Sequence, residues 1–411
     1  MGRNEAAQHW QDRWRCDTVT EHAQQAQAAR ASSPAGWPAS EISKLENGVV
    51  ELVVRNQGGH FAEFRFSGST GASSTNMLWE SPWRYERLEN ARPQDLADTA
   101  GFTGHGLCLD NFGAPSSADA AKGLVQHGEA ARSDWKTMPG EEIARGAAAW
   151  SVRLPVAQLD FERRVRLGSG ESVAFIEEKV TNLRDEEHVC DWVQHATFGP
   201  PFVTREDTRF FASATRGLTA PDGYGPDSLV ESNREFNWPF APAAQVGNER
   251  VDLRLPFAVR GKGITAAVQM DPGRDVEFIA GIHRTLRVGA GYCFRREDFP
   301  WLMIWEENCV RQDRPWYGTT QARGMEFGST PLPGPREATM RRGRLFETPS
   351  WCTIPAKKSK TARYLMFLFR LPIGFDAVGD IAVSGDSIDM VAEDGTRAFS
   401  IPARGCESFL S

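Results

Sequence analysis

The pattern of apolar and polar positions divides the chain into two parts. Residues 5–30 are rich in Ala, Gln, Glu and Arg and contain no Gly or Pro, and Trp10 and Trp14 stand four positions apart on one helical face. This segment predicts an N-terminal helix. Residues 31–38, with two Pro and one Gly, interrupt the pattern and predict a linker.

The remainder of the chain has the pattern of short strands. Residues 159–167 alternate Leu, Phe, Arg, Val and Leu with mostly polar residues, which is the period of a strand. This segment and the next two, joined by short turns, predict an antiparallel meander. Helix signals are confined to residues 116–122 and 336–341. The predicted strands cover residues 49–55, 60–66, 159–167, 173–181, 189–195, 252–259, 276–282, 301–306, 343–348, 364–371, 380–383 and 398–401.

Many strands with Gly and Pro turns and little helix between them favour an all-β fold, a large antiparallel β-sandwich, over a parallel α/β sheet. We expect an N-terminal helical extension and linker at residues 1–40 and one β-sandwich domain at 41–411. Long connections at 81–125 and 212–250 are expected to line the binding face. The helix tryptophans fit two arrangements equally well, packing on the sandwich or forming a homodimer interface.

Composition and charge exclude several classes of function. With 40% hydrophobic and 25% charged residues, the chain is typical of soluble globular proteins. A net charge of −7 argues against a nucleic-acid partner. No run of roughly 18 apolar residues predicts a membrane span, and the polar N-terminus is unlike a secretory signal. Seven scattered cysteines without a CxxC pair favour reduced thiols, so we expect a cytoplasmic location.

The candidate chemistry consists of histidines and carboxylates beside aromatic residues. His127 stands in a Gln-His-Gly segment. His195 is expected at the end of an apolar strand, which is followed by a Gly-Pro-Pro turn. Glu326 lies between Gly324 and Gly328, which indicates a close backbone approach or a sharp bend. Signatures for phosphate-binding loops, zinc sites and nucleophile elbows are absent, and we expect neither a metal nor a cofactor.

Tryptophans beside polar groups suit a small-molecule carbohydrate, because a sugar's C–H face packs on an indole while its hydroxyls form hydrogen bonds. For His60 and His105 a structural role and a functional role are equally compatible with the sequence. The residues expected to contact such a ligand are Arg132, Trp135, Trp192, Trp305, Glu306 and His105.

The order of these segments resembles the galactose mutarotase-like (aldose 1-epimerase) superfamily over roughly residues 45–405. The family's HG…W segment is similar to the stretch from His127-Gly128 to Trp135, and its TN turn before a second histidine is similar to Thr181-Asn182 and His195. Its C-terminal glutamate is similar to Glu326, and its closing hairpin resembles residues 353–367. After the second histidine, sugar epimerases often have an aromatic residue and Asn-Leu, where this chain has Ala-Thr-Phe-Gly.

The resemblance implies an isomerase of carbohydrate metabolism that interconverts sugar anomers by opening and closing the ring, without a cofactor or metal. By resemblance Glu326 is the base at the anomeric hydroxyl and His195 the acid at the ring oxygen. His127 would bond a ring hydroxyl or the ring oxygen, with Arg132 orienting it or contacting an anionic substituent. These roles require an ionised carboxylate and a histidine that titrates near neutrality, which ordinary pKa values allow.

Two other classes of function remain open from the sequence. The same sandwich could bind carbohydrate without turning it over, in which case the three polar residues are ligands only. A polysaccharide lyase-type enzyme would need a Tyr or Arg beside the histidine, and none of the five tyrosines lies in the segments that carry His127, His195 and Glu326.

Overall fold

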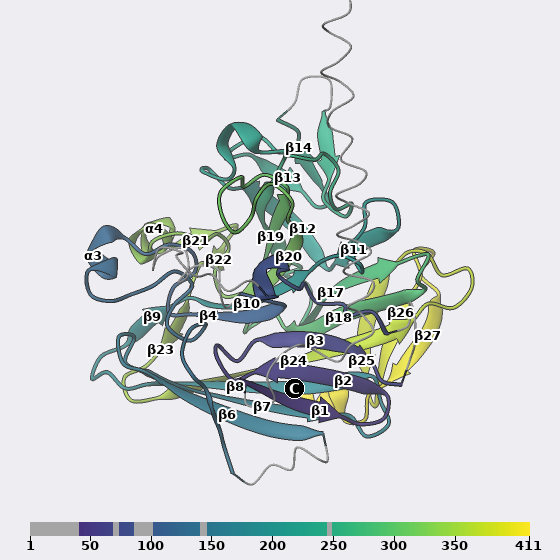
Figure 1. Ribbon diagram of the computed structural model, residues 1–411, viewed down its shortest axis with the longest axis horizontal. Helices are drawn as coiled ribbons and strands as arrows, with labels where there is room; N and C mark the ends of the chain where they lie inside the picture. The colour runs from purple at the N-terminus through teal and green to yellow at the C-terminus, as the bar shows by residue number, and fades with distance from the viewer. Residues whose placement is uncertain (1–40, 69–73, 86–101, 140–145, 245–248) are drawn as a thin grey trace, which may run out of the picture.

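The computed structural model describes residues 41–68, 74–85, 102–139, 146–244 and 249–411. The predicted N-terminal helix and its linker lie outside these ranges. Within them almost all of the regular secondary structure is β-strand, and most of the strands belong to two large antiparallel sheets (Figure 1). The predicted all-β class and antiparallel arrangement are therefore confirmed for the described residues.

The larger sheet has 12 strands and carries the centre of the molecule. In spatial order its strands are β1 (Ile42–Glu46), β2 (Val50–Arg55), β3 (Phe61–Phe66), β4 (His105–Leu109), β10 (Trp192–Phe198), β20 (Gln321–Gly328), β19 (Trp301–Asn308), β16 (Ile264–Met270), β12 (Ala214–Thr219), β13 (Glu235–Asn237), β14 (Phe240–Pro242) and β15 (Arg250–Asp252).

The second sheet has eight strands and packs against the first. Its strands, in spatial order, are β11 (Thr208–Ala212), β17 (Val276–His283), β18 (Val288–Arg295), β24 (Ser359–Arg370), β8 (Val173–Asn182), β7 (Leu159–Leu167), β6 (Ala147–Leu154) and β5 (Lys136–Thr137).

Smaller elements decorate the two sheets, and none of the described helices is long and apolar enough to cross a lipid bilayer. The short strands pair as β21 (Arg344–Leu345) with β22 (Thr348–Pro349), β23 (Cys352–Ile354) with β9 (His188–Cys190), and β25 (Asp380–Ser384) with β26 (Ser387–Val391) and β27 (Arg397–Pro402). The helices are η3 (Pro82–Tyr85), α3 (Ser117–Ala120), η5 (Gly225–Asp227), α4 (Arg336–Arg342) and α5 (Cys406–Leu410).

The predicted meander is wrong in its third strand. Residues 189–195 do not form one strand, because β9 ends at Cys190 and β10 starts at Trp192 in the other sheet. The break falls at Asp191, whose carboxyl accepts hydrogen bonds from the Phe112 amide at 2.9 Å and the Thr330 hydroxyl at 2.7 Å. These distant partners hold the chain where it passes between sheets.

The predicted strand at residues 252–259 is also wrong, since β15 ends at Asp252. There the carboxyl of Asp252 accepts a hydrogen bond from the Arg254 amide at 3.0 Å and pairs with the Arg254 guanidinium at 2.8 Å. A side chain that caps its own backbone two residues on favours a turn over a strand.

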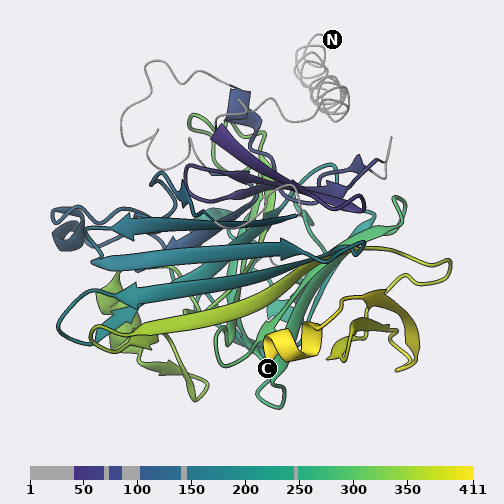
Figure 2. The ribbon, with the colours of Figure 1, turned by 90° about the horizontal axis from the view of Figure 1, so that it is seen from below.

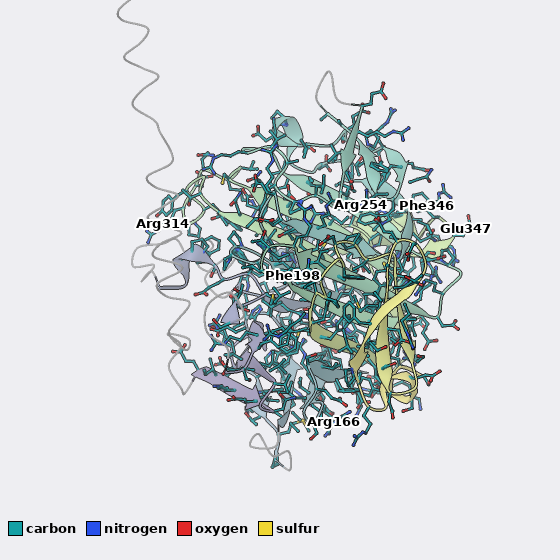
Figure 3. The ribbon with its side chains drawn as sticks, turned by 90° about the vertical axis from the view of Figure 1, so that its right-hand side faces the viewer. Arg166, Phe198, Arg254, Arg314, Phe346 and Glu347 are labelled. Atoms are coloured by element: carbon teal, nitrogen blue, oxygen red, sulfur yellow. The ribbon has the colours of Figure 1, made fainter. Side chains whose placement is uncertain are left out.

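The main core lies between the two sheets, and β10 contributes every second residue to it. Trp192, Ala196 and Phe198 pack in this core, whereas Val193 packs in a separate aromatic cluster on the opposite face of the sheet. Phe198, which lies in the middle of the molecule in Figure 3, packs on Phe210 with ring centroids 5.5 Å apart. Strand β10 therefore has one face in the sandwich and one face outside it.

A second apolar cluster lies beneath the C-terminal sheet of β25, β26 and β27. Ile381, Ile388 and Met390 of this sheet are buried in the same cluster as Phe175 and Phe367 of the eight-stranded sheet. Figure 2 shows the C-terminal sheet and α5 in yellow, at one side of the large sheets. The outer face of the eight-stranded sheet is thus partly covered by the end of the chain.

A fully buried carboxylate joins the two sheets through hydrogen bonds. Glu178 pairs with Arg163 at 2.8 Å, and both side chains are wholly buried. The Glu178 carboxylate also accepts from Trp192 Nε1 at 3.0 Å, from Gln194 Nε2 at 2.6 Å and from the Tyr364 hydroxyl at 3.0 Å. Each donor that reaches it compensates for the loss of hydration on burial.

We expect Glu178→Gln to lower the free energy of unfolding by about 3–5 kcal/mol, because it leaves the buried Arg163 guanidinium without its counter-charge. Urea denaturation monitored by tryptophan fluorescence measures this change. The matched control is Glu235→Gln, since Glu235 pairs with Arg216 at 3.0 Å but is 62% exposed. A midpoint for Glu178→Gln that equals that of the control would contradict the importance of the buried pair.

Candidate functional site

Three neighbouring strands of the larger sheet bring the candidate residues together. Strand β10 lies between β4 and β20, and Figure 1 shows these strands near the centre of the molecule. Gly106 of β4 is the register partner of His195. The pairs Gln194–Phe327 and Thr197–Gly324 place His195 opposite Glu326 on β20. Gly106, His195 and Glu326 share the face of the sheet that points away from the main core, whereas Gln194 and Phe327 face the core.

The two side chains meet across the strands. Glu326 Oε1 lies 3.2 Å from His195 Nε2, with the carboxyl fully buried and the imidazole 6% exposed. Neither oxygen of Glu326 receives a hydrogen bond from a donor among the described residues. The carboxyl of Glu326 is therefore in contact with His195 but forms no hydrogen bond with any other described residue. His195 lies in the middle of β10, and the expectation of a histidine at the strand end is corrected in this respect.

The orientation of the His195 ring is set by the next residue on the same face. His195 Nδ1 lies 2.9 Å from the Thr197 hydroxyl, which itself donates to the His195 carbonyl at 3.4 Å. Because that hydroxyl has donated its only proton, it accepts from Nδ1–H. The Nε2 atom then carries a lone pair directed at Glu326. Thr197 is one of the residues where the chain departs from the sugar epimerases.

Burial holds both members of the pair in their neutral forms. Loss of hydration raises the pKa of Glu326 well above its usual value. Loss of hydration, reinforced by His127, lowers the pKa of His195 well below its usual value. A protonated Glu326 can donate to the lone pair on His195 Nε2. The ordinary pKa values expected from the sequence are thus wrong for both residues.

His127 lies beside this pair in a strained backbone conformation. Its φ angle is 62°, in the left-handed region, and its ring centroid is 5.4 Å from that of His195. His127 Nδ1 accepts from the Gly113 amide at 3.3 Å and contacts the Cys108 thiol at 3.2 Å. Burial, with further contributions from the charges of nearby arginines, lowers the pKa of His127 to about 4.

His127 and His195 line one pocket, whose volume of about 40 Å³ has room for a few water molecules, and Glu326 lies behind His195 outside its lining. A ligand the size of a sugar ring must therefore lie across its mouth and insert hydroxyl groups, or displace side chains. The lining comes from β4, β10 and three connections, and consists of His60, Phe102, Gly106, Leu107, Cys108, Gln126, His127, Ala131, Arg132 and His195.

Aromatic rings surround the pocket on the side of β19. The Phe102 ring meets His195 edge-on, with centroids 4.7 Å apart, and Trp305 lies 6.0 Å from His195. The Trp305 indole donates to the Tyr224 hydroxyl at 2.7 Å and lies beside Trp316. Phe102 and Tyr224 lie in the regions 81–125 and 212–250, which were expected to be long connections. That expectation is wrong in part, because β4 lies in the first region and β12, β13 and β14 lie in the second. The aromatic wall offers a surface on which an apolar ligand face can pack.

The glycines around Glu326 have distinct steric roles. A Cβ atom at Gly324 would lie 2.4 Å from Glu326 Oε1 and 3.2 Å from the Trp305 Cβ. At Gly328 it would lie 2.6 Å from a Val193 methyl group and 2.8 Å from the Trp192 carbonyl oxygen. The close approach predicted from the two glycines is confirmed. Gly324 leaves the space that the carboxyl occupies.

Of the other expected ligand contacts, the structure places Arg132 in the pocket lining and Trp305 beside it. Trp135 is buried in the main core, where its indole donates to the Ala130 carbonyl at 2.9 Å. Glu306 is buried on the opposite face of β19 and pairs with Arg323 at 2.8 Å.

The remaining two expected contacts belong to the buried network of Glu178. His105 Nε2 lies 3.0 Å from Gln194 Oε1 and its Nδ1 lies 3.1 Å from the Tyr292 hydroxyl. Trp192 donates to Glu178 itself. Both side chains point into the sandwich, away from the pocket.

Several lining residues had no role in the sequence-based hypothesis. Phe102, Cys108 and Gln126 were not singled out, and His60 was left between two interpretations. The alternation in the segment from His105 to Leu109 could have placed Gly106 and Cys108 on one face, opposite to His105. No signal in the sequence could have shown which face points toward the pocket.

The site offers no cation-binding geometry. Among the residues that the structure describes, no group of three or more His, Cys, Asp or Glu side chains could hold a metal ion. The six described cysteines are free and buried, as expected from their spacing. What the arrangement can do chemically is move a proton between a carboxyl and an imidazole beside a small polar pocket.

We expect Gly324→Ala to displace the Glu326 carboxyl, because the added methyl group would overlap Oε1. The Glu326 pKa should fall, since a displaced carboxyl regains contact with water. Titration of the side-chain carboxyl by carbon-13 NMR measures this shift. Gly223→Ala is the control, because its Cβ would meet no atom closer than 3.6 Å. An unchanged Glu326 titration in Gly324→Ala would contradict the steric role.

The free energy of unfolding should also depend on the protonation state of Glu326. Above the usual pKa of 4.5 the unfolded chain has lost this proton while the folded protein retains it, so stability falls as pH rises toward the folded pKa. Glu326→Gln cannot titrate. We expect its free energy of unfolding to rise relative to wild type by about 1.4 kcal/mol per pH unit in that window. Urea denaturation at several pH values measures this, and parallel curves would contradict it.

Comparison with solved structures finds this architecture in proteins of other organisms. A galactose mutarotase-like protein from Clostridium acetobutylicum is 14% identical, with a TM-score of 0.53, and the match covers 80% of this chain and 95% of that one. The galactose mutarotase related enzyme from Lactobacillus acidophilus is 13% identical, with a TM-score of 0.50, over 81% of this chain and 98% of that one. No family model and no curated protein matches the sequence.

At such low sequence identity the similarity shows the fold only. The chemistry has to be inferred from the residues of the site. Both structures span four fifths of this chain and nearly the whole of their own. The order of the sequence motifs and the arrangement of the two sheets both agree with these two structures. The chain has the galactose mutarotase-like fold.

Proposed function

We propose that the protein is an aldose 1-epimerase-type isomerase that interconverts sugar anomers at the pocket beside His195. The observation that carries this proposal is the contact of 3.2 Å between His195 Nε2 and the buried Glu326 carboxyl. An acid and a base must act together when a hemiacetal ring opens, and this pair can supply both.

The pair holds one proton over a wide range of pH. The pKa of Glu326 lies well above its usual value and that of His195 well below, so protonated Glu326 and neutral His195 coexist near neutrality. Transfer of that proton across the contact gives an ionised carboxylate and an imidazolium, which are the roles implied by the resemblance. Either form contains one proton donor and one proton acceptor. A polar ligand in the pocket would favour the charged form by solvating it.

In the proposed reaction Glu326 takes the proton of the anomeric hydroxyl as His195 gives one to the ring oxygen. The bond from the anomeric carbon to the ring oxygen breaks, and an open-chain aldehyde forms. After the aldehyde rotates, His195 takes the proton back from the same oxygen. The ring closes on the other face of the carbonyl while Glu326 returns its proton, so no net proton is consumed.

His127 and Arg132 are proposed to orient the sugar. His127 lies next to His195 and lines the same pocket as Arg132. The low pKa of His127 keeps its imidazole neutral, and because Nδ1 accepts from the Gly113 amide, the ring can donate from Nε2–H to one hydroxyl group. Phe102 and Trp305 supply the apolar surface beside it. A neutral polyhydroxylated ligand fits this combination.

Binding without turnover is the second candidate. Two features favour it: the pocket of about 40 Å³ is smaller than a sugar ring, and burial raises the pKa of Glu326 and lowers that of His195, which favours the neutral form of each. In that case the pair would serve only as a hydrogen-bond donor and acceptor. The two candidates differ in one measurable quantity, the rate at which anomers interconvert.

The test follows the optical rotation of freshly dissolved aldohexoses with Glu326→Gln and His195→Asn. Each variant should lose about 10²- to 10⁴-fold in rate, which is the contribution of a positioned acid or base. Asn at position 195 retains a donor to Thr197, so the local strand geometry is preserved. Near neutral pH the wild-type rate should vary little, because the pair keeps its single proton.

Glu337→Gln is the matched control, since Glu337 is 77% exposed on α4 and pairs only with Arg341 among the residues described. It should retain the wild-type rate. Full activity of both site variants would refute the assigned roles. Sugar binding by the wild type without any acceleration of mutarotation would establish the binding candidate in place of the enzyme.

A further inference from the structure

The His60 side chain has a nitrogen that no group in the described structure satisfies. The residue follows Gly59 just before β3 and is 2% exposed. Its Nε2 lies 3.1 Å from the Ala131 carbonyl oxygen, whereas no hydrogen-bond partner among the described residues reaches Nδ1. Buried polar atoms without a partner are uncommon, and they destabilise the fold unless something binds there.

The unpaired atom is an acceptor. A carbonyl oxygen only accepts hydrogen bonds, so Nε2 carries the proton and Nδ1 carries a lone pair. Burial also lowers the pKa of His60 to about 3, which keeps the ring neutral at ordinary pH. No donor among the described residues serves this nitrogen, which leaves its lone pair available to a ligand.

The Nδ1 atom lies on the same side of the sheet as the acid–base pair. A Cβ atom added to Gly106 would stand 2.8 Å from His60 Nδ1. Gly106 is the register partner of His195, and a Cβ there would point to the same face as the His195 side chain. His60, Gly106 and His195 all line the pocket.

Two glycines hold the ring in this orientation. A Cβ at Gly58 would lie 2.4 Å from His60 Nε2, and one at Gly106 would lie 2.8 Å from Nδ1. The absence of both side chains makes room for an imidazole between the β2–β3 turn and β4. His60 Nε2 is bound to the Ala131 carbonyl on one side of the ring. Nδ1, on the other side, faces the pocket.

We propose that His60 is a substrate-positioning residue whose Nδ1 accepts a hydrogen bond from a hydroxyl group of the ligand. This inference rests on the proposed function and adds to it a determinant of specificity, because a site with a buried acceptor discriminates against analogues that lack the donor. The acceptor at position 60 selects ligands that carry a hydroxyl group at this place. In the absence of a ligand, a water molecule in the pocket can occupy the same position.

The test compares His60→Leu with His60→Asn, two side chains of nearly the same shape. Both remove the bond to Ala131, so their structural cost is shared. Only Asn places an acceptor, its Oδ1, where Nδ1 lies in the wild type. Thermal unfolding first establishes that both variants fold. Calorimetric titration with a panel of aldohexoses and their monodeoxy derivatives then gives the affinities.

We expect His60→Leu to bind the preferred aldohexose about fivefold to tenfold more weakly than His60→Asn, which is the loss of one hydrogen bond. One monodeoxy sugar should bind the wild type with a similar loss and should lose nothing further with His60→Leu. Equal affinities of the Leu and Asn variants for every sugar would overturn the inference.

The outcomes separate this inference from the proposed function. If the wild type accelerates mutarotation while the Leu and Asn variants bind equally, only the role of His60 falls. If the wild type binds sugar without turnover and His60→Leu binds more weakly, the proposed catalysis falls and the role of His60 stands. If the wild type neither binds nor turns over any sugar of the panel, both are refuted.

Discussion

Burial of the Glu326 carboxyl against His195 is the constraint to which the other features of the site respond. A carboxyl without water or a protein donor is held neutral, and a neutral carboxyl needs an acceptor near it. His195 supplies that acceptor at Nε2, because its Nδ1–H donates a hydrogen bond to the Thr197 hydroxyl. Gly324 supplies the space. Two titratable groups can thus share one proton inside the protein with no counter-ion.

The contrast with Glu178 shows how much the environment of a carboxyl determines its use. Both residues are fully buried on central strands. Glu178 is paired with Arg163 and accepts hydrogen bonds from three further side chains, whereas Glu326 receives none from the described residues. The first arrangement ties the two sheets together. The second leaves a proton that can be moved. Glu178, on β8 of the eight-stranded sheet, lies between the two sheets, whereas Glu326, on β20 of the 12-stranded sheet, lies on that sheet's other face.

The local pattern of apolar and polar residues predicts many of the strands, whereas the features that depend on long-range contacts could not be predicted from it. Alternation in residues 159–167 predicts β7 to the residue, because burial on one face of a strand is written into its own sequence. The change of sheet at Asp191 depends on Phe112 and Thr330, which no local pattern reveals. The glycines beside Glu326 correctly indicated a close approach, whereas the pKa shifts of the pair depend on burial that only the assembled sheets create.

The two-faced character of β10 has a consequence for how the site can adapt to different ligands. His195 sits between Gln194 and Ala196, whose side chains are fixed in the sandwich, so the strand cannot shift without disturbing the packing between the sheets. His195 and Glu326 are therefore held by strands that also form the core. The remaining wall, around Phe102 and the segment that carries Arg132, lies on connections. Exchange of those connections could redirect specificity while the sheet and its proton pair stay unchanged.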